Sequence, residues 1–138
     1  MAGCYNNGVE QFQYYYKLSD NSIIMLIIYD TMGQIGFRQR LNEKYFNKAD
    51  CCIVVYDITD RRAFKEVVEN YYIEKIKELC KKNIKVILVG NKTDLEHYRQ
   101  IPYNEAANLA FLNNYLFIET SCVKNENVFD TFEKIIGI

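Results

Sequence analysis

The chain has 138 residues, a formal net charge of −1 and a sequence pI near 5.9. This length predicts a single domain over residues 1–138, and 49% hydrophobic and 25% charged residues are typical of a globular protein with an ordinary core. Because there is no basic excess to hold a phosphate backbone, the composition argues against a nucleic-acid partner.

The first predicted elements form a β-hairpin. Residues 9–18 and 22–29 are aromatic and aliphatic runs separated by a short polar segment, as in two antiparallel strands joined by a turn. Residues 30–40 contain glycines and polar residues, and they are interpreted as a loop that runs into a short helix near 39–47.

From residue 51 onwards, apolar runs alternate with segments of helical periodicity. The run "CCIVVYD" is continuous enough to predict a strand that is buried on both faces, and Thr59 or Asp60 can cap the helix that follows. The later elements are expected as a strand over 84–90, a helix over 103–113, a strand over 115–120 and a helix from Asn127. Buried strands that alternate with amphipathic helices predict an α/β fold, with a mostly parallel sheet in three layers and helices on both faces.

Ligands of such sheets bind at the carboxyl ends of the strands, so the residues just after each apolar run are the candidate functional residues. They are Asp30, Asp57, Asn91 and Ser121.

The segment "DTMGQ" follows the strand over 22–29. Asp30 is a candidate Mg²⁺ ligand, Gly33 allows a backbone N–H to approach a phosphate, and Gln34 can orient a water molecule. An ordinary turn after a strand is the alternative.

The segment "NKTD" follows the strand over 84–90. A carboxylate such as Asp94 can accept two N–H groups at once, which guanine offers on N1 and its exocyclic amine and adenine does not. The stem of Lys92 could lie over the base plane, while the alternative is a solvated loop that begins with an Asx turn at Asn91. The last predicted strand is followed by "TSCV", whose small residues would let backbone N–H groups reach a base carbonyl; taken alone, this segment is better explained by the alternative, an ordinary loop turn.

Together and in this order, the segments resemble the small GTPases of the Ras superfamily, most closely the Rab family. "YDTMGQIGFR" is similar to W-D-T-A-G-Q-E-R-F-R, and "YFNKADCCIVVYDITD" to Y-Y-R-G-A-D-G-I-I-V-V-Y-D-V-T-D. "VILVGNKTDL" contains the family's guanine motif, and "FIETSCVKNENV" resembles F-x-E-T-S-A-K-x-x-x-N-V. The resemblance runs from about Gly8 to Ile136.

The resemblance implies the G domain of a P-loop NTPase that binds GTP or GDP with Mg²⁺. It assigns Asp30 to the metal site and Gln34 to catalysis. The nucleotide-binding residues it implies are Gly33, Asn91, Lys92, Asp94, Ser121, Cys122 and Val123. Protein regulators and effectors would bind around residues 30–47.

One motif of the family does not occur among the 138 residues, namely the phosphate-binding loop G-x-x-x-x-G-K-[ST]. We therefore expect an N-terminally truncated domain, without the family's first strand and helix, in which GTP binding and hydrolysis are impaired. The longest apolar run is too short to cross a bilayer, and no lipidation motif is visible. We expect a cytoplasmic monomer without a membrane anchor.

Three hypotheses follow. The first is a Rab-like, guanine-nucleotide-dependent switch in intracellular vesicle traffic. The second is a non-catalytic remnant of a GTPase that acts as a protein-interaction module. The third is an unrelated doubly wound nucleotide or phosphate binder, which four ordered motifs disfavour.

Overall fold

A computed structural model describes residues 4–6, 9–18, 20–31 and 45–137. The chain divides into two compact units, residues 1–48 and residues 49–138. Each unit is described by itself. The short helix predicted near 39–47 falls mostly outside the described residues.

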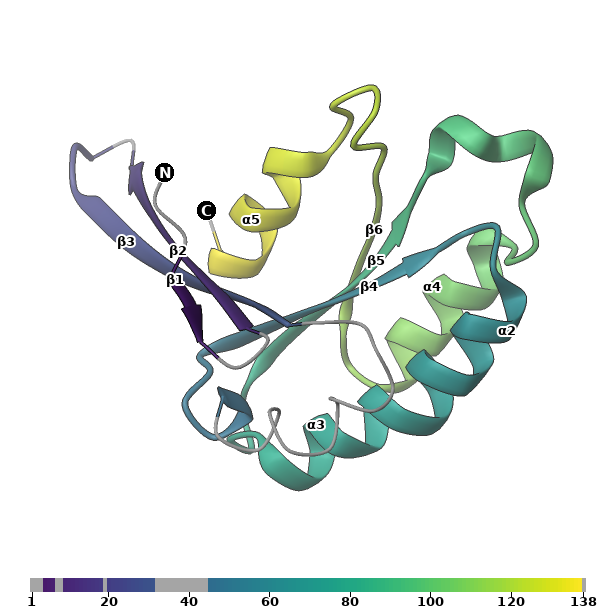
Figure 1. Cartoon of the computed structure of the whole chain (residues 1–138), viewed down its shortest axis with the longest axis horizontal. Helices are drawn as coiled ribbons and strands as arrows, with labels where there is room; N and C mark the ends of the chain where they lie inside the picture. Colours follow the sequence, from purple (N-terminus) through teal and green to yellow (C-terminus); the bar gives the residue numbers. More distant parts are fainter. Residues whose placement is uncertain (1–3, 7–8, 19, 32–44, 138) are drawn as a thin grey trace. The chain divides into compact units, whose positions relative to one another are not determined.

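The first unit contains three antiparallel strands in the order β1-β2-β3 (Figure 1). They are β1 (Cys4–Asn6), β2 (Val9–Lys17) and β3 (Ile23–Thr31). The β2–β3 ladder runs from Val9 opposite Thr31 to Lys17 opposite Ile23, which confirms the predicted hairpin. Its turn is closed by the Asp20 carboxylate, which accepts from both the backbone N–H and the hydroxyl of Ser22.

The second unit is built on a parallel sheet in the order β4-β5-β6. Its strands are β4 (Cys51–Asp57), β5 (Lys85–Asn91) and β6 (Leu116–Glu119). Asp57 is in register with Asn91, and Gly90 with Glu119. Because the strands are parallel and in this register, their carboxyl ends meet at one edge of the sheet.

Helices connect these strands and cover both faces of the sheet. A continuous helical segment follows β4, made of α2 (Arg61–Ala63), η1 (Phe64–Tyr72) and α3 (Ile73–Leu79). Of the two candidate caps in the sequence, Thr59 and Asp60, it is Asp60 that caps this segment, by accepting from the N–H of Ala63 at 2.8 Å. The remaining helices are a 3₁₀ segment η2 (Thr93–Tyr98), α4 (Tyr103–Leu112) and α5 (Val128–Ile136).

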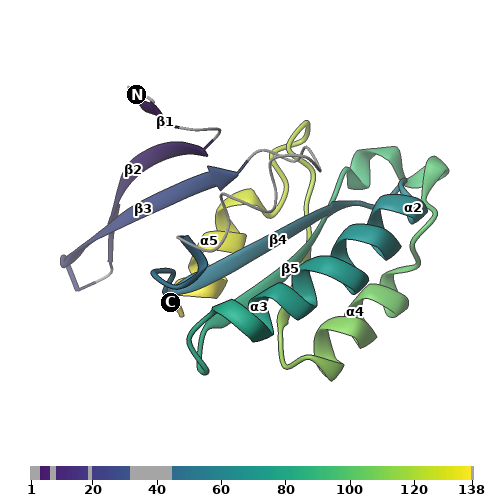
Figure 2. The same ribbon diagram turned by 60° about the horizontal axis from the view of Figure 1, so that its bottom comes forward.

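In Figures 1 and 2, α3 and α4 lie on one face of this sheet and α5 on the other, so the predicted α/β fold with helices on both faces is confirmed. Within the described part of the chain, no helix is both long enough and apolar enough to span a bilayer.

The core of the second unit is centred on β5, whose residues 86–90 are all buried. Ile87 and Val89 pack against Ile135 of α5. On the opposite face, the rings of Tyr56 in β4 and Phe64 in η1 meet edge-on, with their centroids 4.7 Å apart.

The prediction that the strand over 51–57 is buried on both faces is wrong. Val54 and Tyr56 are buried, but Ile53 and Val55 alternate with them and are exposed. The reason is that β4 lies at the end of the strand order of its sheet, while α5 packs over the central strand β5.

Candidate functional site

The loops that follow β4, β5 and β6 are joined to each other by backbone hydrogen bonds. The N–H of Ile58 donates to the carbonyl of Asn91 at 3.1 Å, and that of Thr120 donates to Gly90 at 2.8 Å. The N–H of Thr93 then donates to the carbonyl of Thr120 at 3.1 Å. Residues 57–60, 91–98 and 120–127 therefore form one connected surface, which we call the strand-end site.

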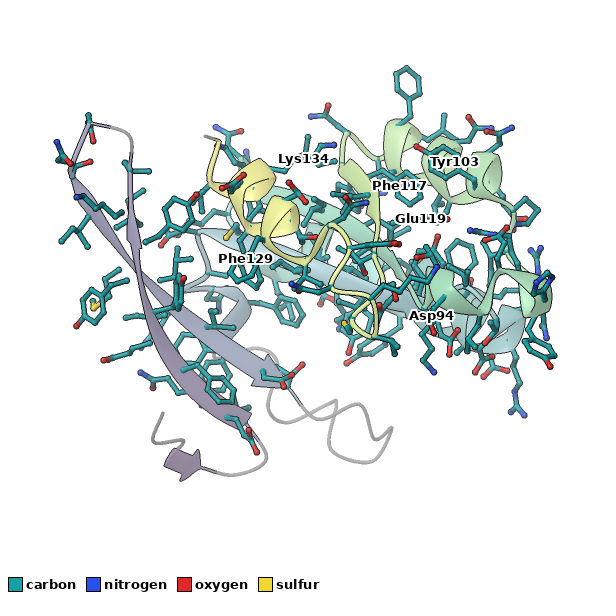
Figure 3. All side chains as sticks on the ribbon, turned by 90° about the horizontal axis from the view of Figure 1, so that it is seen from above. Asp94, Tyr103, Phe117, Glu119, Phe129 and Lys134 are labelled. Carbon is teal, nitrogen blue, oxygen red and sulfur yellow. The ribbon has the colours of Figure 1, made fainter. Side chains whose placement is uncertain are left out.

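Asp94, labelled in Figure 3, and Ser121 are hydrogen-bonded to each other within the strand-end site. The Ser121 hydroxyl donates to Oδ1 of Asp94 at 2.6 Å, and it accepts from the N–H of Lys124 at 3.1 Å. The backbone of Ser121 also forms a two-bond bridge with Glu126. The bond from Ser121 uses one lone pair of Oδ1, so both carboxylate oxygens of Asp94 keep the capacity to accept a hydrogen bond from a ligand.

The Asn91 side chain is oriented by the loop after β6. Its Oδ1 accepts from the Thr120 hydroxyl at 3.1 Å and from the Cys122 thiol at 3.5 Å. The two N–H groups on Nδ2 are then the donors that Asn91 can offer to a ligand.

Lys92 has a left-handed backbone, with φ 73°, and its side chain forms an ion pair with Asp57 at the end of β4. The Nζ–Oδ2 distance is 2.5 Å. Oδ1 of Asp57 also accepts from the N–H and the hydroxyl of Thr59, at 2.8 and 2.6 Å.

The Asp57–Lys92 pair shifts the pKa of both groups. Partial burial acts to raise the pKa of Asp57, but the hydrogen bonds from Lys92 and Thr59 outweigh burial and lower that pKa below its ordinary value. The hydrogen bond to Asp57 raises the pKa of Lys92. Both side chains are therefore charged at neutral pH.

Arg99 holds the loop after β5 against the end of β6. Its guanidinium donates to both carboxylate oxygens of Glu119, at 2.7 and 2.8 Å, and also to Glu96 and to the carbonyl of Ile101. The pKa of Arg99 is raised, chiefly by the hydrogen bonds to Glu119. A bidentate pair of this kind fixes the orientation of both partners.

The structure brings together five of the predicted site residues in the strand-end site, namely Asn91, Lys92, Asp94, Ser121 and Cys122. Val123 follows them in the same loop, and its side chain is exposed.

The other predicted site residues lie in residues 1–48. Asp30 is an exposed residue of β3, opposite Glu10 of β2, whereas Gly33 and Gln34 lie outside the described residues. Among the side chains that the structure describes, no group of three or more His, Cys, Asp or Glu could hold a metal ion.

Sequence reasoning gave no role to several residues that organise the site. Asp57 was a candidate only because it follows an apolar run, and its bond to Lys92 was not anticipated. Thr120 and Arg99 were also missed. Thr120 is a hydroxyl residue and Arg99 a basic residue, and both lie close to motifs that the sequence analysis identified. A residue type and its place near a motif do not indicate which group the side chain binds.

The parallel sheet, its helices on both faces and the loops at its carboxyl edge define an α/β domain of the P-loop GTPase class. The sequence model of the Ras family matches residues 5–137, and the chain belongs to this family as a Rab-like small GTPase.

The curated relatives include Ras-related protein Rab-11C of Dictyostelium discoideum, which is 36% identical over 117 residues, or 85% of this chain and 51% of that protein. GTP-binding protein ypt3 of Schizosaccharomyces pombe is 38% identical over 117 residues, or 85% and 53%. Ras-related protein Rab-2B of Dictyostelium discoideum is 38% identical over 111 residues, or 80% and 54%. The chain spans about half the length of these relatives.

Proposed function

We propose that the protein is a Rab-like, guanine-nucleotide-dependent switch in intracellular vesicle traffic, and that residues 1–138 form one partial G domain that works in the cytoplasm. The Rab-like part of this proposal rests on the family match, and the observation that carries its nucleotide-binding part is the 2.6 Å hydrogen bond from Ser121 to Asp94. It fixes a carboxylate at the strand ends of a parallel sheet, where ligands of such sheets bind.

In this proposal the strand-end site reads guanine. The Asp94 carboxylate accepts from N1–H and the exocyclic amine, a donor pair that adenine lacks. Asn91 donates from Nδ2 to a ring nitrogen, and the stem of Lys92 lies along the base. The backbone N–H groups of Cys122 and Val123 would bind the base oxygen, because the N–H of Ser121 donates to Glu126.

The phosphates and Mg²⁺ would be bound mainly by other residues. Asp30 would serve the metal, Gly33 the γ-phosphate and Gln34 the attacking water, and regulators and effectors would bind around residues 30–47. The 138 residues contain no G-x-x-x-x-G-K-[ST] loop to hold the β- and γ-phosphates. Each missing charge-assisted contact is worth about 1.5–3 kcal/mol, so these 138 residues by themselves should bind GTP weakly and hydrolyse it at the background rate.

The lack of a G-x-x-x-x-G-K-[ST] motif among these 138 residues favours a second function for them, that of a non-catalytic module that binds partner proteins. The two functions are separated by nucleotide binding, because a protein-interaction module needs none.

Calorimetry of the 138-residue chain with GDP and with ADP, both with Mg²⁺, tests the proposal. Weak binding of GDP with a clear preference over ADP is expected, and equal affinities would contradict a guanine-reading site. A phosphate-release assay with GTP tests the expectation that GTP binding and hydrolysis are impaired. Turnover above background, together with micromolar or tighter binding, would contradict that expectation.

A further inference from the structure

Four residues follow the apolar runs of the sequence, namely Asp30, Asp57, Asn91 and Ser121. The proposed function gives no role to Asp57. In the structure it holds the ammonium group of Lys92 at 2.5 Å, inside the strand-end site. We infer that Asp57 is a positioning residue, which holds the Lys92 side chain where its stem can lie along the guanine base and keeps its ammonium group from binding phosphate. The strand-end site should therefore bind guanosine about as well as it binds GDP. This inference rests on the proposed function.

Both partners of the pair are held by the backbone. Asp57 is the last residue of β4, in register with Asn91 of β5, and Thr59 fixes its carboxylate through two hydrogen bonds. Lys92 follows Asn91 directly, and its left-handed backbone is a conformation that lysine seldom adopts. The strand register and this turn therefore determine where the four-carbon stem of Lys92 runs, from the loop after β5 to the end of β4.

The local charge shows why Lys92 is a poor phosphate ligand while this pair is intact. Asp57, Asp94 and Asp60 all act electrostatically on the ammonium group of Lys92. Because Asp57 already pairs with the ammonium at 2.5 Å, a phosphate would have to displace that carboxylate and would be repelled by it. A neutral guanosine meets no such repulsion, and it can use the Lys92 stem and the Asp94 carboxylate as they stand.

An exposed ion pair usually stabilises a protein very little, and the side chain of Lys92 is 50% exposed. The Asp57 side chain is only 24% exposed and is fixed by Thr59, so the pair costs less side-chain entropy than one between two mobile side chains.

The test compares guanosine with GDP, in the presence of Mg²⁺, for the 138-residue chain, its Asp57→Asn variant and a control variant, Asp130→Asn. Asn is nearly isosteric with Asp and keeps a hydrogen-bonding oxygen for Thr59. Asp130→Asn makes the same charge change at an exposed position in the first turn of α5. The measured quantity is the ratio of the two dissociation constants.

The wild-type chain should bind guanosine and GDP within about threefold of each other, and Asp57→Asn should shift the ratio towards GDP by roughly tenfold, as the freed ammonium becomes available to phosphate. The control should leave the ratio unchanged. A wild-type preference for GDP of more than about tenfold, or an Asp57→Asn ratio equal to that of the wild type, would overturn the inference.

A second measurement does not depend on nucleotide. Limited acylation of the folded chain, read by peptide mass spectrometry, reports the reactivity of each lysine. Lys92 should react more slowly than the exposed Lys134, and Asp57→Asn should accelerate Lys92 by roughly threefold or more without changing Lys134. If neither ligand binds, the proposed function fails and the ligand preference with it. An unchanged Lys92 rate in Asp57→Asn would instead show that Asp57 does not hold Lys92.

Discussion

At the scale of single residues, Ser121 is a fully buried polar side chain whose hydrogen-bonding capacity is used. Its hydroxyl donates to Asp94 and accepts from the N–H of Lys124, so it links the loop after β5 to the loop after β6. A buried hydroxyl without such partners would destabilise the fold, so these hydrogen bonds favour the arrangement in which the two loops lie against each other.

Replacing Ser121 with alanine should lower the free energy of unfolding by about 1–2 kcal/mol, because the Lys124 N–H loses its acceptor and Asp94 loses a short donor. Urea denaturation of the chain measures this change. Val123→Ala is the matched control, since this side chain in the same loop is exposed, and its effect should stay within about 0.5 kcal/mol. Equal effects of the two variants would contradict the role assigned to the Ser121 hydroxyl.

Asp57 makes the stability depend on pH in a predictable direction. Partial burial opposes ionisation, but the hydrogen bonds from Lys92 and Thr59 lower the pKa of Asp57 in the folded chain. A carboxyl group whose pKa is lower in the folded than in the unfolded state contributes stability above its unfolded pKa, about 3.9, and loses that contribution as the pH falls through the folded-state pKa.

Asp57→Asn should therefore reduce the loss of stability between pH 7 and pH 3, by about 1 kcal/mol or less because the pair is partly exposed. Denaturation at both pH values checks this. The Asp130→Asn control should retain the wild-type difference, and an unchanged difference in Asp57→Asn would mean that the Lys92 and Thr59 bonds do not favour the charged carboxylate.

The sequence predicted the chemistry of the site better than its internal contacts. Asn91 and Ser121 could be placed at one edge of the sheet because each follows a strand and the carboxyl ends of parallel strands share one edge, while the nucleotide-binding role of these residues and of Asp94 stays a prediction. The Asp57–Lys92 pair could not, because it depends on the register between β4 and β5 and on the left-handed turn at Lys92. Neither is encoded in a local pattern of residue types, since lysine is not a residue that normally signals such a turn.

At the scale of the elements, β4 illustrates how an apolar run can mislead. "CCIVVYD" has the uninterrupted composition of a strand covered on both sides, yet only the face with Val54 and Tyr56 is buried. β5 has a similar composition and is buried throughout residues 86–90, because it has a strand on each side and helices on both faces. Strand position within the sheet, rather than composition, separates the two cases.

The two faces of β4 can be compared with one substitution at neighbouring residues. Val54→Ala, at a side chain that is 8% exposed, should cost about 2 kcal/mol through lost burial and the cavity left behind. Val55→Ala, at one that is 56% exposed, should cost less than about 1 kcal/mol. Thermal or urea unfolding measures both, and a larger loss at Val55 would show that this face is covered in the folded protein.

At the scale of the whole chain, the two units differ in how much core they contain. Among the described residues of the first unit, Val9 is the one hydrophobic side chain in the buried class, and β3 exposes Ile23, Met25, Ile27 and Tyr29. The second unit buries all of residues 86–90 and packs helices on both faces of its sheet. A three-stranded antiparallel sheet with little buried area is near the limit of independent stability.

Hydrogen exchange in the native chain should therefore separate the units. Amides of the β2–β3 ladder have strand hydrogen bonds, but few buried apolar contacts oppose their opening, so they should exchange through low-energy local unfolding. Amides of β5, bonded on both sides by β4 and β6, should be the most protected in the molecule. Mass spectrometry of peptides covering 9–17 and 85–91 gives the exchange rates of both strands under one condition. Guanidinium at low concentration should leave exchange in peptide 9–17 fast and nearly unchanged, and it should accelerate exchange in peptide 85–91, which needs a larger unfolding. Equal protection of both peptides would mean that the chain opens as a single cooperative unit, and that the hairpin gains its stability from contacts beyond its own sheet.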